Sequence, residues 1–300
     1  MPPRKKKRKS NPISTRKRNH FPVFALFVFI FIIGVVFGGG GVHLFGEKKI
    51  TFNNPYYSPK VYLPPSGFVL GDKDKAFNIP ILLYHYVEIN SDPKDTIRIS
   101  LTIPRNVFEK QIQSLLSEGY TFLTVSEVGK ILDGKMAMPG KAVVLTFDDG
   151  YRDFYTDVFP LLQFYNIKAT LFVVSGFLNH SNNITNEQLS DIVKSGLVEI
   201  GGHTVNHASL TSLSKERAKW EIEEDKKILE QKFGIKMTSF AYPYGLFDED
   251  VANIVKDAGY LQAVSVIRGN EQTKSNRYFL FRIRPGAGIG EYLIRSISMK

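Results

Sequence analysis

The 300-residue sequence contains no cysteine. This absence excludes disulfide bonds, zinc sites built on thiolates and enzymes that use a cysteine nucleophile. The first twenty residues also lack aspartate and glutamate, although they hold nine lysines and arginines. Removing these nine from the total of 39 basic residues leaves 30 against 29 acidic residues, so the formal charge of +10 comes from one tail. We therefore predict that the rest of the chain does not bind nucleic acid.

A long apolar run follows the basic tail. Phe21 to Val42 carries no charge and would extend about 33 Å as a helix, enough to cross a hydrocarbon core of roughly 30 Å. We predict a cytoplasmic tail at 1–20 and a transmembrane signal-anchor helix at 21–43, with the remainder outside the cell. A cleaved signal peptide is the alternative, although the run is long for one and lacks an A-x-A-like site. We expect a single-pass cell-membrane protein of a Gram-positive type of envelope.

Two regions follow the apolar run. Residues 44–78 contain four prolines and no clear periodicity, which is typical of a semi-rigid extracytoplasmic spacer. From residue 79 onward strand-like and helix-like stretches alternate. We expect strands at 79–87, 142–147, 169–176, 197–203, 238–243, 261–266 and 279–285, and helices at 104–119, 186–195, 215–233 and 248–258.

This alternation over about 220 residues predicts a parallel-sheet α/β domain at 79–300. Its length suits a barrel, and a doubly wound open sheet is the alternative. No glycine-rich phosphate loop follows the first strand, which disfavours the nucleotide-binding version of the open sheet.

Polar clusters follow three of the predicted strands at their C-terminal ends. They are the Asp148–Asp149 pair in TFDDG, the histidines of HTVNH at 203–207, and AYPYG at 241–245. In α/β barrels the C-terminal strand ends converge on the face that carries the active site. We therefore expect one site to be built from all three clusters.

The two histidines suggest a metal ion. His203 and His207 are four residues apart, so a helical turn would point both imidazoles toward one metal, whereas surface or satisfied histidines are the alternative. A carboxylate is the usual third ligand of a catalytic zinc site with an open position for water. One member of the Asp148–Asp149 pair can fill this role, and the other can serve as general base.

Taken together, TFDDG, the H-T-x-x-H spacing and the later Pro-Tyr pair resemble the polysaccharide deacetylase (NodB homology) family, the family-4 carbohydrate esterases. The resemblance covers residues 79–300 and implies a distorted (β/α) barrel, related to the TIM barrel. It implies an enzyme that removes acetyl groups from N-acetylated sugars, mainly N-acetylglucosamine polymers. Asp148 would be the catalytic base, and the backbone N–H of Tyr244 would help to bind the oxyanion. The ligands of a divalent metal, usually zinc, would be Asp149, His203 and His207.

Two departures from the family pattern concern proton transfer. Tyr242 stands where the family commonly has an arginine that orients the base. No histidine follows His207, so the late histidine that many members use as an acid is absent, and FLFRIRP offers Arg282 and Arg284 instead. The YHYV strand is similar to the branch with exported deacetylases of biofilm poly-N-acetylglucosamine. His85 in this strand is therefore a candidate proton donor or hydrogen-bond partner of the metal centre, with a packed strand histidine as the alternative.

Several functions stay open at this point. An exopolysaccharide and peptidoglycan are both N-acetylated polysaccharide substrates that the sequence does not separate. Paired carboxylates could hydrolyse glycosidic bonds, but neighbours on one strand end are poorly placed to flank a bond from both sides. A non-catalytic wall-binding or polysaccharide-binding relative would also fit the two departures. The sequence does not predict the oligomeric state.

Overall fold

The computed structural model describes residues 75–89 and 92–298. The expected tail at 1–20, the expected membrane anchor at 21–43 and nearly all of the spacer at 44–78 lie outside the described residues. Within the part of the chain that is described, no helix combines the length and the apolar character needed to cross a membrane.

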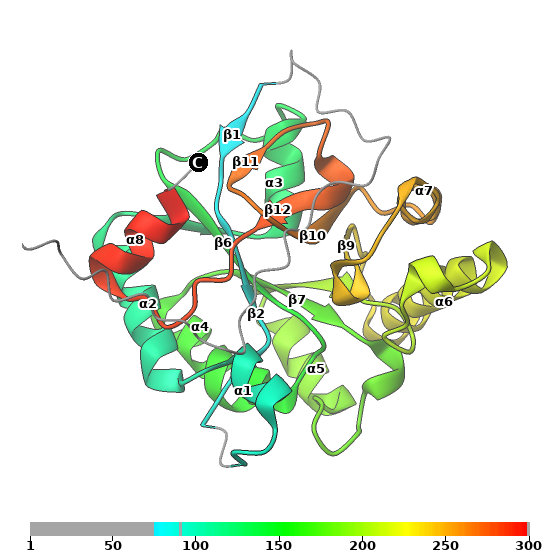
Figure 1. The fold of residues 1–300 in the computed structure, drawn as a ribbon, viewed down its shortest axis with the longest axis horizontal. Helices are drawn as coiled ribbons and strands as arrows, with labels where there is room; N and C mark the ends of the chain where they lie inside the picture. The colour runs from blue at the N-terminus through cyan, green and yellow to red at the C-terminus, as the bar shows by residue number, and fades with distance from the viewer. Residues whose placement is uncertain (1–74, 90–91, 299–300) are drawn as a thin grey trace, which may run out of the picture. The chain divides into compact units, whose positions relative to one another are not determined.

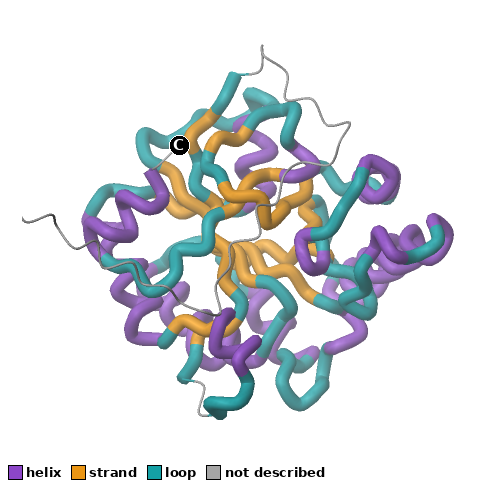
Figure 2. The backbone as a smooth tube through the Cα atoms, in the orientation of Figure 1, coloured by secondary structure: helices purple, strands orange, loops and turns teal. Residues whose placement is uncertain are grey.

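A parallel sheet forms the centre of the domain (Figures 1 and 2). Its neighbouring strands are all parallel, in the order β12 (Leu280–Arg282), β10 (Gln262–Arg268), β9 (Ser239–Ala241), β8 (Val198–Gly202), β7 (Ala169–Val173), β6 (Ala142–Phe147) and β2 (Ile81–Tyr84). β5 (Thr121–Leu123) pairs with the first half of β6. The sheet closes where Leu82 of β2 bridges Ile283, directly after β12. The fold is therefore a near-closed parallel β/α barrel, as expected, and the open doubly wound sheet is wrong.

Helices surround this sheet and connect its strands (Figure 2). They are α2 (Arg105–Ser117), α3 (Val125–Leu132), α4 (Phe159–Tyr165), α5 (Asn186–Lys194), α6 (Lys215–Phe233), α7 (Glu249–Asp257) and α8 (Gly290–Ser298). Ser214 caps α6, because its side chain accepts a hydrogen bond from the backbone N–H of Arg217. Two small pairs complete the domain: β3 (Tyr86–Val87) with β4 (Thr102–Ile103) beside α1 (Thr96–Leu101), and β1 (Phe77–Asn78) with β11 (Glu271–Gln272).

Alternate residues of β6 belong to two hydrophobic clusters. Leu145 packs in the larger cluster with side chains of the surrounding helices, whereas Val144 packs with Phe172 and Leu280 of other barrel strands. Because successive strand side chains point to opposite faces, Asp148 continues the inner row that contains Val144. The strand period thus directs this carboxylate toward the barrel interior.

The first predicted strand, at 79–87, is interrupted in the structure. β2 ends at Tyr84, and Tyr86–Val87 leaves the barrel sheet to pair with β4. The residues on both sides of the break are buried, so their hydrophobic pattern gave no sign of it. His85 occupies the break and therefore lies at the mouth of the barrel.

Candidate active site

The three polar clusters lie at the C-terminal ends of β6, β8 and β9, as expected. Six non-glycine residues in the described part of the chain have a positive φ, and four of them belong to these clusters: Asp149, Thr204, His207 and Tyr244. Such backbone conformations cost about 1–3 kcal/mol each and concentrate at functional sites. The strand ends are thus bent away from regular structure where the polar side chains converge.

Asp149, His203 and His207 bring three metal-ligand atoms together. Oδ1 of Asp149 lies 3.2 Å from Nε2 of His203 and 3.1 Å from Nε2 of His207. The three ligand atoms all lie within 4.8 Å of one another. Two imidazole nitrogens and one carboxylate oxygen are a donor set typical of a divalent metal that keeps an open coordination position.

Hydrogen bonding selects the tautomer of His203. Its Nδ1 lies 2.7 Å from the backbone oxygen of Ala241. A carbonyl oxygen only accepts, so Nδ1 carries the proton and Nε2 presents a lone pair to Asp149. Oδ1 of Asp149 is buried and has no hydrogen-bond partner among the described residues. Two acceptor atoms 3.2 Å apart repel each other unless a cation or a proton lies between them, so these residues fit a divalent metal.

The charges of this cluster shift the pKa values of its members. Burial acts to raise the pKa of Asp149, but the neighbouring imidazoles of His203 and His207 hold that pKa well below its ordinary value. Burial acts to lower the pKa of His203, whereas the Asp149 and Asp148 carboxylates raise it by more. The site therefore favours positive charge next to its two carboxylates.

A buried arginine holds Asp148. Nη1 of Arg282 lies 2.8 Å from Oδ1 of Asp148, and Nη2 lies 2.8 Å from Oδ2. Nε of Arg282 donates to the backbone oxygen of Ser265 at 2.7 Å, and Nη1 donates to the Thr146 hydroxyl at 3.2 Å. Burial acts to raise the pKa of Asp148, but Arg282 keeps that pKa below its ordinary value. The carboxylate is thus ionised and fixed in orientation, as a general base must be.

Tyr242 does not replace the arginine of the family pattern. Its side chain is buried, its hydroxyl donates to the backbone oxygen of Tyr278 at 2.7 Å, and its ring stacks on Phe247 at 4.7 Å between centroids. Tyr242 is therefore a packing residue. The arginine that contacts the Asp148 carboxylate is instead Arg282, on β12.

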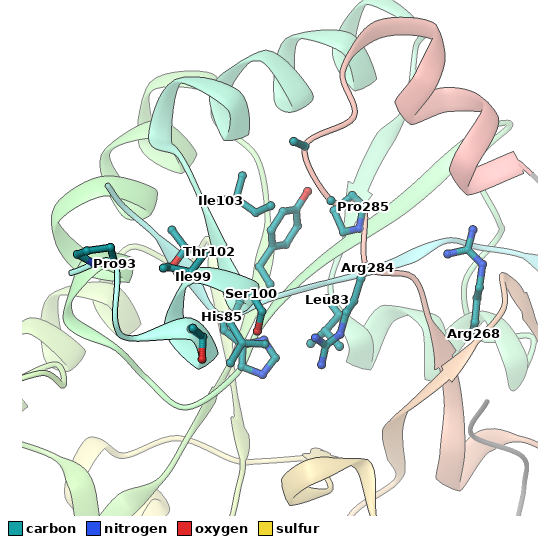
Figure 3. Close-up of a pocket in the computed structure, with 15 residues that line it drawn as sticks. Leu83, His85, Pro93, Ile99, Ser100, Thr102, Ile103, Arg268, Arg284 and Pro285 are labelled. Atoms are coloured by element: carbon teal, nitrogen blue, oxygen red, sulfur yellow. The ribbon is translucent and has the colours of Figure 1, made fainter. Parts of the chain in front are cut away.

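His85 lies beside Asp148 at the barrel mouth. The backbone N–H of Asp148 donates to the backbone oxygen of Tyr84 at 3.1 Å, so the residues that follow β6 and β2 are level. The half-buried His85 side chain lines a pocket together with Arg284 (Figure 3). Burial lowers the pKa of His85 against the opposing effects of Asp148 and Asp149, so its imidazole is neutral near pH 7.

Tyr244 lies next to the metal ligands. It follows β9 in a tight turn with φ of 60°, and its ring centroid lies 4.6 Å from that of His207. More than half of its side chain is exposed, at 58%. The ring of Tyr244 thus lies at the edge of the Asp149, His203 and His207 cluster.

Known proteins are similar to this chain in sequence and in fold. The family model for polysaccharide deacetylase matches residues 135–263. YxkH of Bacillus subtilis, a protein named as a polysaccharide deacetylase, is 30% identical over 216 residues, which cover 72% of this chain and 74% of YxkH. The chain belongs to the polysaccharide deacetylase family. The resemblance seen in the sequence is thereby confirmed.

Further members of the family show the same relationship. A poly-beta-1,6-N-acetyl-D-glucosamine N-deacetylase of Staphylococcus aureus is 28% identical over 207 residues, covering 65% of this chain and 71% of that protein. The Streptococcus pyogenes deacetylase PplD, solved in complex with acetate, matches with a TM-score of 0.70 at 29% identity and covers 75% of this chain and 100% of PplD. IcaB from Ammonifex degensii matches with a TM-score of 0.63 at 25% identity, and the match covers 74% of this chain and 96% of IcaB.

Two candidate site residues of this polysaccharide deacetylase lie outside the segment that the family model matches. His85 precedes residues 135–263, and Arg282 follows them. The candidate site of this family member is therefore completed by the first and the last strand of its barrel, which also close the sheet against each other.

Sequence reasoning missed Asp225 on α6. Its Oδ2 accepts a hydrogen bond from the backbone N–H of His203 at 3.1 Å, and its Oδ1 accepts one from Ser175 N–H at 3.1 Å. Burial raises the pKa of this carboxyl group to about 7. A signal was present, because Asp225 lies in the buried stripe of α6 with Ile222 and Leu229, where an unpaired carboxylate is costly.

Asp153 was also missed. It is buried, and its Oδ2 accepts a hydrogen bond from the backbone N–H of Val87. Burial raises the pKa of Asp153 to about 6. This contact ties β3 to the segment after TFDDG and so stabilises the chain break at His85.

Proposed function

We propose that the protein is a metal-dependent hydrolase that removes N-acetyl groups from N-acetylglucosamine polymers of the cell envelope. The observation that carries the proposal is the position of Asp148, ionised and oriented by Arg282, beside the three potential metal ligands. The activity for which the S. aureus relative is named supports this class of polymer. Exopolysaccharide and peptidoglycan both contain the required N-acetyl group.

Asp149, His203 and His207 would hold the metal, for which we propose zinc. When bound there, the metal would polarise the acetyl carbonyl and lower the pKa of a water molecule toward about 7. Asp148 takes a proton from the water as its oxygen attacks the acetyl carbon. Arg282 keeps Asp148 ionised for this step.

The oxyanion that develops on the acetyl oxygen needs a donor. We propose the backbone N–H of Tyr244, since this residue follows β9 and its ring packs against His207. A single donor of this kind contributes about 3 kcal/mol to catalysis.

Cleavage of the carbon–nitrogen bond gives acetate and a free amine on the sugar, and the departing nitrogen requires a proton. Asp148 can return the proton that it took from the water. His85 is the second candidate donor, because it lies level with Asp148. Its imidazole is neutral near pH 7, so only its minor protonated form could supply this proton.

Two further parts of the proposal concern the rest of the chain. We propose that residues 21–43 anchor the protein in the cell membrane, and that residues 44–78 separate the catalytic domain from it. The basic residues in the first twenty positions support this orientation. A non-catalytic role has less support, since Arg282 supplies the contact that Tyr242 does not make.

The proposal is tested by measuring acetate release from poly-N-acetylglucosamine, chitin oligomers and peptidoglycan, with and without a chelator. We expect release that the chelator abolishes and added zinc restores. Asp148→Asn should bind metal as the wild type does and release acetate at least about 1000-fold more slowly. Near-normal release by metal-loaded Asp148→Asn would contradict the base assignment, and no release from any polymer would contradict the function.

A further inference from the structure

A pocket of about 580 Å³ opens beside the proposed catalytic residues (Figure 3). One wall is formed by Leu83 to His85 at the end of β2. A second wall is formed by α1 and β4, at 96–103, and a third by 284–287 after β12. This volume lies within the range of about 300–1,000 Å³ that is usual for small-ligand sites.

The pocket adjoins the site of deacetylation. His85 lines it and is level with Asp148 on the neighbouring strand. On the other side of β2, Leu83 N–H donates to the backbone oxygen of Ile283 at 2.9 Å, so Arg284 directly follows the segment beside β2, and it lines the same pocket as His85. Asp148, His85 and Arg284 therefore follow three adjacent strands in a row, and a polymer bound at Asp148 has a neighbouring sugar within reach of the pocket.

The charge of the pocket is positive and uncompensated. Its described lining contains Arg268 and Arg284 but no aspartate or glutamate. Arg284 makes no ion pair or hydrogen bond with any described residue, and Arg268 donates only to the backbone oxygen of Ser296. By contrast, Arg98 on α1 forms a two-pronged ion pair with Glu88.

We propose that this pocket is a subsite for an anionic sugar, bearing a carboxylate or a phosphate, that adjoins the N-acetylated sugar to be deacetylated. This rests on the proposed function. The guanidinium of Arg284 matches the planar, bidentate geometry of either anion. Ile99, Ile103 and Pro285 supply the apolar wall that a sugar ring needs, and a neutral homopolymer would leave the arginine charge without a counterpart.

The test compares acetate release from three oligomers of equal length. One is neutral N-acetylglucosamine oligomer, one carries N-acetylmuramic acid with a free carboxylate, and one carries a 6-phosphate on the neighbouring sugar. We expect the wild-type chain to favour an anionic oligomer in kcat/KM, mainly through KM. In Arg284→Gln the ratio of anionic to neutral kcat/KM should fall about tenfold, and Arg284→Lys should lose less. Arg295→Gln, on α8 and outside the pocket lining, is the matched control and should keep the wild-type ratio.

Direct binding gives a readout that does not depend on turnover. Calorimetric titration with N-acetylmuramic acid, N-acetylglucosamine 6-phosphate and N-acetylglucosamine should show tighter binding of one anionic sugar to the wild type, and loss of that difference in Arg284→Gln. Which anion binds more tightly identifies the group recognised. Equal binding of all three sugars, or an equal decrease for neutral and anionic oligomers in Arg284→Gln, would overturn the subsite. Absence of acetate release with anion binding intact would instead contradict the proposed function alone.

Discussion

Arg282 and Asp148 are 134 residues apart in the sequence, yet they form a two-pronged ion pair with both nitrogen–oxygen distances at 2.8 Å. Both side chains are buried, so neither charge has water as an alternative partner. A buried strand that ends in two neighbouring carboxylates is stable only when a positively charged group lies beside each of them. Asp149 faces His203 and His207, and Asp148 faces Arg282.

Replacement of Arg282 should change the pH dependence of the reaction. Without the guanidinium the pKa of Asp148 rises, so the acid limb of kcat/KM should move to higher pH in Arg282→Gln, and kcat should fall about 100-fold. Arg282→Lys keeps the charge but not the two-pronged geometry, so its kcat and its acid limb should lie between those of the wild type and those of Arg282→Gln.

A purely structural role of Arg282 would give another result. Loss of one partner of a buried pair costs about 3–5 kcal/mol, so thermal unfolding of each variant is the necessary control. A folded Arg282→Gln protein whose pH profile matches the wild type would refute the role assigned to this residue.

Metal content should depend on the three converging ligands. In His207→Gln the purified protein should contain far less zinc than the wild type, as measured by elemental analysis, because two ligands no longer suffice for a tight site. His180→Gln removes a histidine from a loop outside the cluster and serves as the matched control. Equal zinc in both variants would exclude His207 as a ligand.

Asp225 should affect metal affinity without contacting the metal. Both of its oxygens accept backbone N–H groups, and the amide of Asp225→Asn can satisfy only one of them. We expect zinc affinity to fall about 10–100-fold and the free energy of unfolding to fall by about 2 kcal/mol. Glu223→Gln, exposed on the same helix, should leave zinc affinity at the wild-type value.

Asp153 should make stability decrease as the pH rises from about 4 to 6. Its pKa is raised from 3.8 to about 6 in the folded protein, so the folded state holds a proton that the unfolded state has lost over this interval. The protonated carboxyl group adds about 3 kcal/mol to the free energy of unfolding. This contribution is complete below pH 3.8 and is lost as the pH rises through about 6.

Denaturant unfolding at several pH values tests this contribution. Asp153→Asn stays neutral and can still accept the Val87 N–H, so its stability should decline less than that of the wild type over this interval. Asp157→Asn makes the same substitution at a less buried aspartate four residues later and serves as the control. Parallel curves for the wild type and Asp153→Asn would refute the assignment.

The sequence was sufficient for most of the fold and for the convergence of the polar clusters. Strands such as 142–147 are almost continuously apolar, and α6 runs from Lys215 to Phe233 as expected, with its cap at Ser214. Parallel strands place their C-terminal ends on one face, so the sequence alone predicts that TFDDG and the two histidines converge.

What the sequence could not provide depends on contacts between distant segments. Nothing local distinguishes Arg282 from Arg284, yet Arg282, the last residue of β12, is buried against Asp148, whereas Arg284 lies beyond the end of the strand and is exposed. The break at His85 depends on the pairing of β3 with β4 and on Asp153, and neither follows from the apolar pattern of 79–87.

Because Arg282 lies on the last barrel strand, it is added late during synthesis of the chain. A chain is made from its N-terminus, so a growing polypeptide acquires His85, Asp148, Asp149 and the two clustered histidines before Arg282 exists. At that stage Asp148 has no counter-charge, and β2 has no strand to close against. The centre becomes complete only when the end of the domain has been synthesised, so a product truncated before β12 would retain Asp149, His203 and His207 but lack the arginine that orients Asp148.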